Sequence, residues 1–135
     1  MPPERLAPTD PLEWLNRARS NLAQARAGSN IPEVYLEDLC FDAQQAAEKA
    51  TKAVLIDLKV PFPYVHDLAE LLGLAERNGA VVPEAVREAV RLTRFAVATR
   101  YPGPQEPVTR NEYENAIAIT EAVVRWAEER LGKKQ

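Results

Sequence analysis

The chain has 135 residues and a net charge of −3, with 46% hydrophobic and 27% charged residues. This length suits one domain with a hydrophobic core, and the composition is ordinary for a globular protein. The slightly acidic balance argues against broad electrostatic binding of nucleic acid, although it leaves a local basic patch open. No apolar run approaches the roughly 20 residues of a membrane-spanning helix, so we expect no membrane contact.

The chain has one cysteine and one histidine, which limits the disulfides and metal sites that it can form. The single cysteine, Cys40, cannot form an internal disulfide, which fits a reducing cytoplasm, where we expect the protein. Cys40 falls on the apolar side of its helix, where a buried thiol is favoured over a nucleophile. One histidine without a cysteine cluster does not make a zinc site, and no glycine-rich phosphate loop is present. We therefore expect neither a metal nor a cofactor.

The first helix is marked at both ends. Asp10 is a suitable N-cap, Pro11 suits the first helical position, and Glu13 completes a capping box. Gly28 can adopt the left-handed conformation that ends many helices. These signals predict a helix over residues 11–27.

A long alanine-rich helix follows, beginning near Pro32 and running to about Lys59. Alanines allow a neighbouring helix to come close and have the highest helix propensity. Phe41, Leu55 and Ile56 fall away from the main apolar face. A helix that is apolar on two sides is either central to its bundle or shared with a second subunit. We predict a homodimer that uses this helix and the fourth one.

Three further helices complete the prediction. The third begins at Asp67 and stops at Asn78-Gly79, and the fourth begins at Pro83 and ends at Arg100. Residues 101–107 are too rich in proline for a helix, and the fifth helix starts after them. The sequence thus predicts an all-α, up-and-down bundle of about five helices. We expect a single domain over residues 10–131, with flexible termini at 1–9 and 132–135.

The polar side of the second helix offers candidates for phosphate binding. Lys49 and Lys52 are three residues apart and share a face, so two amines there can hold a phosphate. The alternative is that both are solvated and pair with Glu48 or Asp42, as charges on helix faces usually do.

Two further candidates lie at helix ends. His66, beside Asp67, can act as a general base or contact a phosphate at a helix N-terminus. Alternatively its imidazole packs the turn, with Asp67 as the N-cap. Arg100 lies near the inner stripe of its helix and needs a carboxylate, phosphate or carbonyl partner, while Tyr101 either stacks on a base or packs.

A basic stripe on the fourth helix is the last candidate. Arg87, Arg91 and Arg94 are spaced so that they can contact RNA phosphates. Glu84 and Glu88 are interleaved with them at helical spacing, so self-paired, solvated charges are the favoured interpretation.

Three motifs in order make the chain resemble the HEPN family, small helical bundles associated with nucleotides, nucleotidyltransferases and RNA cleavage. They are Ala46-Ala47-Glu48-Lys49 through Lys52, then His66-Asp67-Leu68, then Arg100-Tyr101-Pro102. The resemblance spans Leu12 to Leu131. It implies a dimeric nucleotide- or RNA-binding module of a prokaryotic toxin–antitoxin-like pair, with a separate minimal nucleotidyltransferase as partner. The implied ligand-binding residues are Glu48, Lys49, Lys52, His66, Asp67, Arg100 and Tyr101.

The resemblance leaves catalysis open. HEPN proteins that cut RNA carry a histidine four to six residues after an arginine; Arg100 matches the arginine, but residues 104–106 contain no histidine. A tyrosine that other members place in this window is also missing. One alternative is a metal-independent endoribonuclease that uses Arg100 with His66 as an unusual base. Another is a non-catalytic dimeric interaction module.

The up-and-down path predicts where these residues meet. The third helix would begin where the second ends, and the fourth would end near the same pole. We therefore expect Lys49, Lys52, His66, Arg100 and Tyr101 to line one cleft.

Overall fold

The structure, a computed structural model, describes residues 1–96, 102–103 and 107–132. Over these residues its regular elements are all helical, which confirms the predicted all-α bundle of about five helices. The α-helices are α1 (Pro11–Ala27), α2 (Leu36–Asp57), α3 (Leu68–Arg77), α4 (Glu84–Arg87) and α5 (Arg110–Gly132). Two 3₁₀ helices, η1 (Gly28–Asn30) and η2 (Glu88–Ala96), follow α1 and α4. None of these described helices is both long and apolar enough to cross a membrane.

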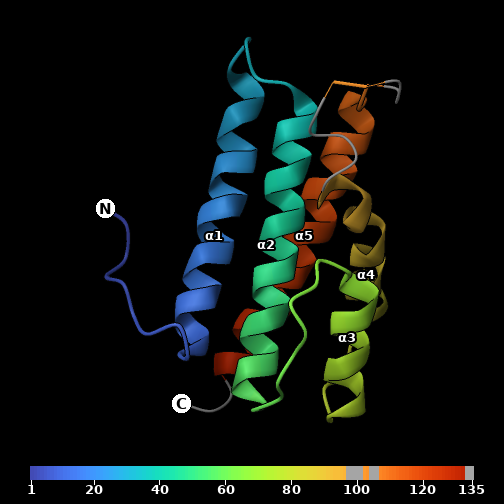
Figure 1. Ribbon diagram of the computed structural model, residues 1–135. Helices are drawn as coiled ribbons and strands as arrows, with labels where there is room; N and C mark the ends of the chain where they lie inside the picture. The colour runs from blue at the N-terminus through green and yellow to red at the C-terminus, as the bar shows by residue number, and fades with distance from the viewer. Residues whose placement is uncertain (97–101, 104–106, 133–135) are drawn as a thin grey trace.

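The long helices α1, α2 and α5 pack against one another, and α3, α4 and η2 lie on the other side of α2 (Figure 1). The path departs from a simple up-and-down order at one step. Residues 58–67 fold back along α2, so α3 starts about halfway up the bundle and runs in the same direction as α2 (Figure 1). The expectation that the third helix begins where the second ends is therefore wrong, and the start of α3 lies beside the middle of α2.

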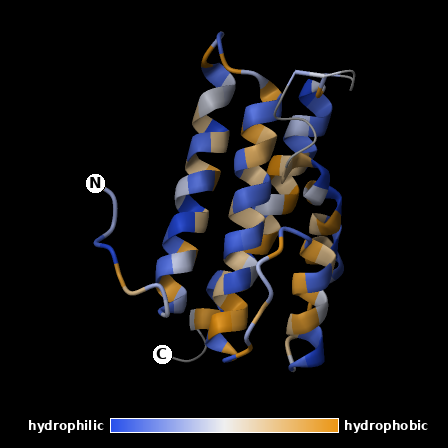
Figure 2. Ribbon diagram, viewed as in Figure 1, coloured by the Kyte–Doolittle hydropathy of each residue, from blue (hydrophilic) through white to orange (hydrophobic). Residues whose placement is uncertain are grey.

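Helix α2 is the centre of the bundle. Of its 22 residues, only Asp38 is exposed, and Leu55 is completely buried within the chain. Figure 2 shows hydrophobic residues recurring along α2 and α3, and many hydrophilic residues along α1. The two-sided apolar character of α2 is thus satisfied inside one subunit, and it no longer argues for a dimer interface on this helix.

Gly28 does not stop α1 in the way we predicted. Its φ of −65° is right-handed, and the chain continues into η1. A Cβ atom at this position would lie 2.4 Å from Leu39 Cδ2, so any larger residue would push the Leu39 side chain of α2 aside. Helix α2 also begins later than predicted, at Leu36, and it ends at Asp57, before Pro61.

The predicted fourth helix is split into α4 and a long 3₁₀ segment, η2. Val86, Ala89, Leu92 and Phe95 are all buried, and they recur every three residues. A 3₁₀ helix has three residues per turn, so this spacing keeps all four on one face. An α-helix would rotate the same residues progressively away from the core.

Candidate functional site

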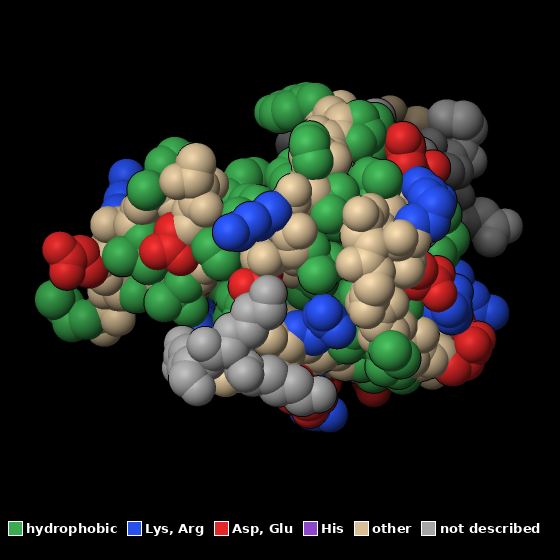
Figure 3. Space-filling model, turned by 90° about the horizontal axis from the view of Figure 1, so that it is seen from below, with side chains coloured by type: hydrophobic (Ala, Val, Ile, Leu, Met, Phe, Trp, Pro, Cys, Tyr) green, Lys and Arg blue, Asp and Glu red, His purple; other side chains and the backbone are tan. Residues whose placement is uncertain are grey.

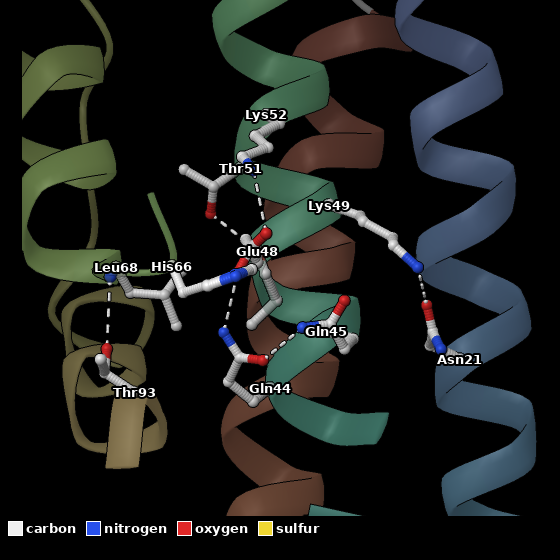
Figure 4. Close-up of polar contacts among 11 residues, drawn as sticks. Asn21, Gln44, Gln45, Glu48, Lys49, Thr51, Lys52, His66, Leu68 and Thr93 are labelled. Atoms are coloured by element: carbon white, nitrogen blue, oxygen red, sulfur yellow. Dashed lines mark hydrogen bonds and ion pairs between the residues drawn. The ribbon is translucent and has the colours of Figure 1, made fainter. Parts of the chain in front are cut away.

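Glu48 is the centre of a polar cluster on the side of α2 that faces α3 (Figure 4). Its Oε1 accepts hydrogen bonds from Gln44 Nε2 at 3.0 Å and from His66 Nδ1 at 2.8 Å. Its Oε2 accepts from Lys52 Nζ at 2.9 Å. The side chains of Glu48 and Lys52 are only 5% and 6% exposed, so this is a buried ion pair. The cluster therefore brings together three of the predicted site residues, Glu48, Lys52 and His66.

Local structure explains how the cluster is assembled. Gln44, Glu48 and Lys52 are spaced by four residues, which places them on one face of α2. His66 belongs to segment 58–67, which folds back along α2. Two hydrogen bonds fix the start of α3 just after it. Asp67 Oδ1 accepts from Ala69 N at 3.0 Å as the N-cap, as predicted, and Leu68 N donates to Thr93 Oγ1 of η2 at 3.3 Å.

The carboxylate of Glu48 determines that Nδ1 of the His66 ring is protonated. Burial raises the pKa of Glu48, but hydrogen bonds from Lys52, His66 and Gln44 outweigh burial and leave this pKa below its ordinary value. An ionised carboxylate only accepts, so His66 Nδ1 carries a proton, and Nε2 either accepts from a ligand or, when it too is protonated, donates to one. The His66 side chain is 51% exposed, and no described residue hydrogen-bonds its Nε2. Such an imidazole can contact a ligand or take up a proton.

Lys52 differs from the solvated lysine that we expected. It pairs with Glu48, but its amine is also surrounded by the rings of Trp14, Phe62 and Tyr64, whose centroids lie 5.9, 5.5 and 5.6 Å from Nζ. Phe62 and Tyr64 belong to the segment that folds back along α2. No sequence spacing links these rings to Lys52, so the sequence could not predict them. The charge of Lys52 is balanced by Glu48, and its amine is covered by the three rings. Lys52 therefore stabilises the cluster and offers little contact to a phosphate.

Lys49 does not join this cluster. Its side chain extends toward α1, where Nζ donates to Asn21 Oδ1 at 2.7 Å (Figure 4). The two amines therefore have different partners in this structure, which argues against a phosphate shared between Lys49 and Lys52. Two positions that are three residues apart on an α-helix differ by about 60° around its axis. Here contacts with different partners carry the two amines to different sides of α2. Arg100 and Tyr101 lie outside the described residues, so the structure leaves their place in a cleft as a prediction.

The arginine stripe is engaged in surface ion pairs. Arg91 Nε lies 3.3 Å from Glu88, as expected for self-paired charges, whereas Arg87 and Arg94 pair with Glu76 of α3 and Glu112 of α5. Figure 3, which views the molecule from below, shows Lys and Arg side chains scattered among acidic and hydrophobic ones, with no broad basic patch on the coloured part of that face. Arg87 and Arg94 thus link neighbouring helices at the surface, which favours the structural interpretation over RNA binding.

This helical bundle is similar to known proteins. The family model described as HEPN domain matches residues 12–131. Among solved structures, the crystal structure of TT1696 from Thermus thermophilus is similar, with 30% sequence identity and a TM-score of 0.77. That match covers 90% of this chain and 98% of the other. No curated protein matched. With nearly the whole length of its bundle accounted for by one family model, this chain belongs to the HEPN domain family.

Proposed function

We propose that this HEPN protein binds the phosphate of a nucleotide or of RNA at the surface beside His66. The observation that carries the proposal is the contact between Glu48 Oε1 and His66 Nδ1, at 2.8 Å. The buried carboxylate holds the ring, and the ring's second nitrogen belongs to a side chain that is 51% exposed. A histidine that only packed a turn would not need a buried, ionised carboxylate to orient it.

The start of α3 contributes less than the sequence suggested. The backbone amides of Leu68 and Ala69 already donate to Thr93 and Asp67, so they are not open to a phosphate. Asp67 acts as a cap, and its ligand role stays a prediction. Thr93 stands seven residues before Arg100 in the sequence, and its contact with Leu68 brings η2 to the start of α3. This contact supports Arg100 and Tyr101 as further ligand contacts.

Binding of a fluorescent oligoribonucleotide and of a nucleoside monophosphate tests the proposal. Arg100→Ala and His66→Ala should each weaken binding by about 1–3 kcal/mol, the usual effect of losing a charge-assisted hydrogen bond. Arg91→Ala is the matched control, because Arg91 pairs with Glu88 at the surface. Unchanged binding by Arg100→Ala, together with a large loss of stability, would make Arg100 a structural ion pair and remove it from the site.

We further propose that the protein pairs with a separate minimal nucleotidyltransferase in a prokaryotic toxin–antitoxin-like system, and that it is a homodimer. Membership of the HEPN family supports both ideas. Co-purification with a nucleotidyltransferase encoded by a neighbouring gene would test the pairing. Light scattering at micromolar concentration would test the dimer, which should bury about 1,200 Å² or more. A monomer at that concentration would contradict it.

Metal-independent RNA cleavage is the second candidate, because the Glu48–His66 pair has the geometry of an oriented general base. In this case Arg100 would stabilise the phosphate, and purified protein should cleave RNA in the presence of a chelator. His66→Ala and Arg100→Ala should abolish the cleavage. Binding without cleavage by the unaltered protein favours the first proposal. A protein that neither binds nor cleaves RNA or nucleotides would instead be an interaction module.

A further inference from the structure

Lys49 is a cation whose charge is poorly balanced. Its Nζ is 2.7 Å from the neutral amide oxygen of Asn21, and within the described part of the chain it forms no ion pair with a carboxylate. Burial, followed by repulsion from Arg17, lowers the pKa of Lys49, and attraction from Glu48 and Asp42 offsets this only in part. Lys52, three residues later, has a carboxylate oxygen at 2.9 Å. A partly buried ammonium without such a partner disfavours folding unless an anion approaches it.

A cavity lies next to this amine. Its volume is about 370 Å³, and we call it the arm cavity because the N-terminal arm forms one wall. Its lining residues are Leu6, Pro8, Glu13, Trp14, Arg17 and Lys49. Pockets of about 300–1,000 Å³ are typical for small ligands, so the arm cavity is large enough for a small organic molecule but not for an oligonucleotide.

Hydrogen bonds hold the arm cavity in shape. Leu6 N donates to Glu13 Oε1 at 2.8 Å, and Trp14 Nε1 donates to the Pro8 carbonyl oxygen at 2.7 Å. Because the indole N–H is already bonded, Trp14 contributes an apolar ring to the wall. Both arm contacts join the chain before α1 to the first turn of that helix.

The charges of the cavity walls do not cancel. Glu13 is matched by Arg17, whose Nε lies 2.6 Å from Glu13 Oε2, and Lys49 adds one further positive charge. The Arg17 side chain is 55% exposed, so the rest of its guanidinium remains available to a ligand. The cavity thus combines two cations, one compensated carboxylate, an aromatic ring and two apolar side chains.

We propose that the arm cavity binds a small aromatic anion, with its ring against Trp14 and its carboxylate or phosphate between Lys49 and Arg17. Such a ligand would supply the counter-charge that Lys49 lacks and would bury its ring against an apolar wall. This site is separate from the surface beside His66 and does not depend on the function proposed there.

Isothermal titration of the full chain with phenyl phosphate, benzoate and inorganic phosphate tests the inference. At least one aromatic anion should bind. Inorganic phosphate should bind at least about tenfold more weakly than that anion. The tighter of the two aromatic probes identifies the preferred head group. Lys49→Met and Arg17→Gln should each weaken binding about tenfold. Arg19→Gln is the matched control, since Arg19 lies on the same helix but pairs with Glu128 of α5, and it should leave the affinity unchanged.

Thermal unfolding of the same variants distinguishes a loss of ligand contacts from a loss of folding. Lys49→Met should melt at the same temperature as the unaltered chain or higher, because it removes a poorly balanced charge. If Lys49→Met fails to fold, its contact with Asn21 is structural and the inference is overturned. The inference is also overturned if neither aromatic probe binds at millimolar concentration, if inorganic phosphate binds as tightly as both, or if Arg17→Gln binds like the unaltered chain.

Discussion

Lys49 and Lys52 lie one helical turn apart on α2, yet their amines have different partners: Lys52 Nζ is 2.9 Å from Glu48 Oε2, whereas Lys49 Nζ is 2.7 Å from Asn21 Oδ1 on α1. One amine is neutralised inside the bundle and helps to hold the carboxylate that orients His66. The other lies beside the arm cavity and is bonded to a neutral amide oxygen instead of a carboxylate. Two residues that look equivalent in the sequence therefore support separate proposals.

The buried pair makes Glu48 important for stability. Glu48→Gln leaves the ammonium of Lys52 buried without a counter-charge, so we expect the free energy of unfolding to fall by about 3 kcal/mol in urea titrations. Adding Lys52→Met to this variant should recover part of the loss, because the unpaired charge is then removed as well. A loss below about 1 kcal/mol for Glu48→Gln would show that the pair does not behave as a buried one.

The contribution of Glu48 should disappear in acid. Its pKa in the folded state lies below the ordinary value of 4.5, because hydrogen bonds from Lys52, His66 and Gln44 outweigh the effect of burial. The stabilisation is therefore fully present above the unfolded-state pKa and is lost as the pH falls through the folded-state pKa. The difference in unfolding free energy between the unaltered chain and Glu48→Gln should be largest near neutral pH and shrink below about pH 4. A difference that stays constant down to about pH 3 would contradict this assignment.

Two glycines should respond to alanine with opposite signs. Gly28→Ala places a Cβ 2.4 Å from Leu39 Cδ2 in the core and should reduce the free energy of unfolding by about 1–3 kcal/mol. Gly73→Ala lies inside α3, where the new Cβ meets only the end of the Arg77 side chain at 3.2 Å. It should raise stability by about 0.5–1 kcal/mol through helix propensity. If chemical denaturation shows Gly28→Ala to be as stable as the unaltered chain or more stable, the packing of Leu39 against Gly28 is not close.

Cys40 should be inert in the folded protein. Burial raises the pKa of its thiol to about 12, so very little thiolate exists at pH 8. A chromogenic disulfide reagent should react with Cys40 only after denaturant unfolds the chain. Reaction of the native protein at the rate of a free cysteine would contradict the burial of this thiol.

Elements with side-chain signals at their ends could be predicted from the sequence. Asp10 and Asp67 cap α1 and α3, and Thr109 and Glu112 form the reciprocal capping box before α5. Gly79 adopts the left-handed φ of +98° expected after α3. Each of these signals acts within one turn of the helix end, which is why it can be read without tertiary context.

The assembly of the site could not be predicted in the same way. Nothing local dictates that residues 58–67 fold back along α2, and this path brings His66 to Glu48, 18 positions earlier in the chain. The direction of the Lys49 side chain also depends on Asn21 of another helix. The three-residue repeat from Val86 to Phe95 indicates the 3₁₀ segment, but it does not fit the 3.6-residue period of an α-helix.

The most direct test of the account uses the fact that His66 is the only histidine, so its ring gives the only imidazole signals in an NMR spectrum. Addition of a nucleoside monophosphate or a short RNA should shift these signals in a saturable way. Arg100→Ala should move the midpoint to higher ligand concentration by a factor equivalent to about 1–3 kcal/mol. Imidazole signals that do not move while the ligand is shown to bind would place the ligand elsewhere and contradict the proposed site beside His66.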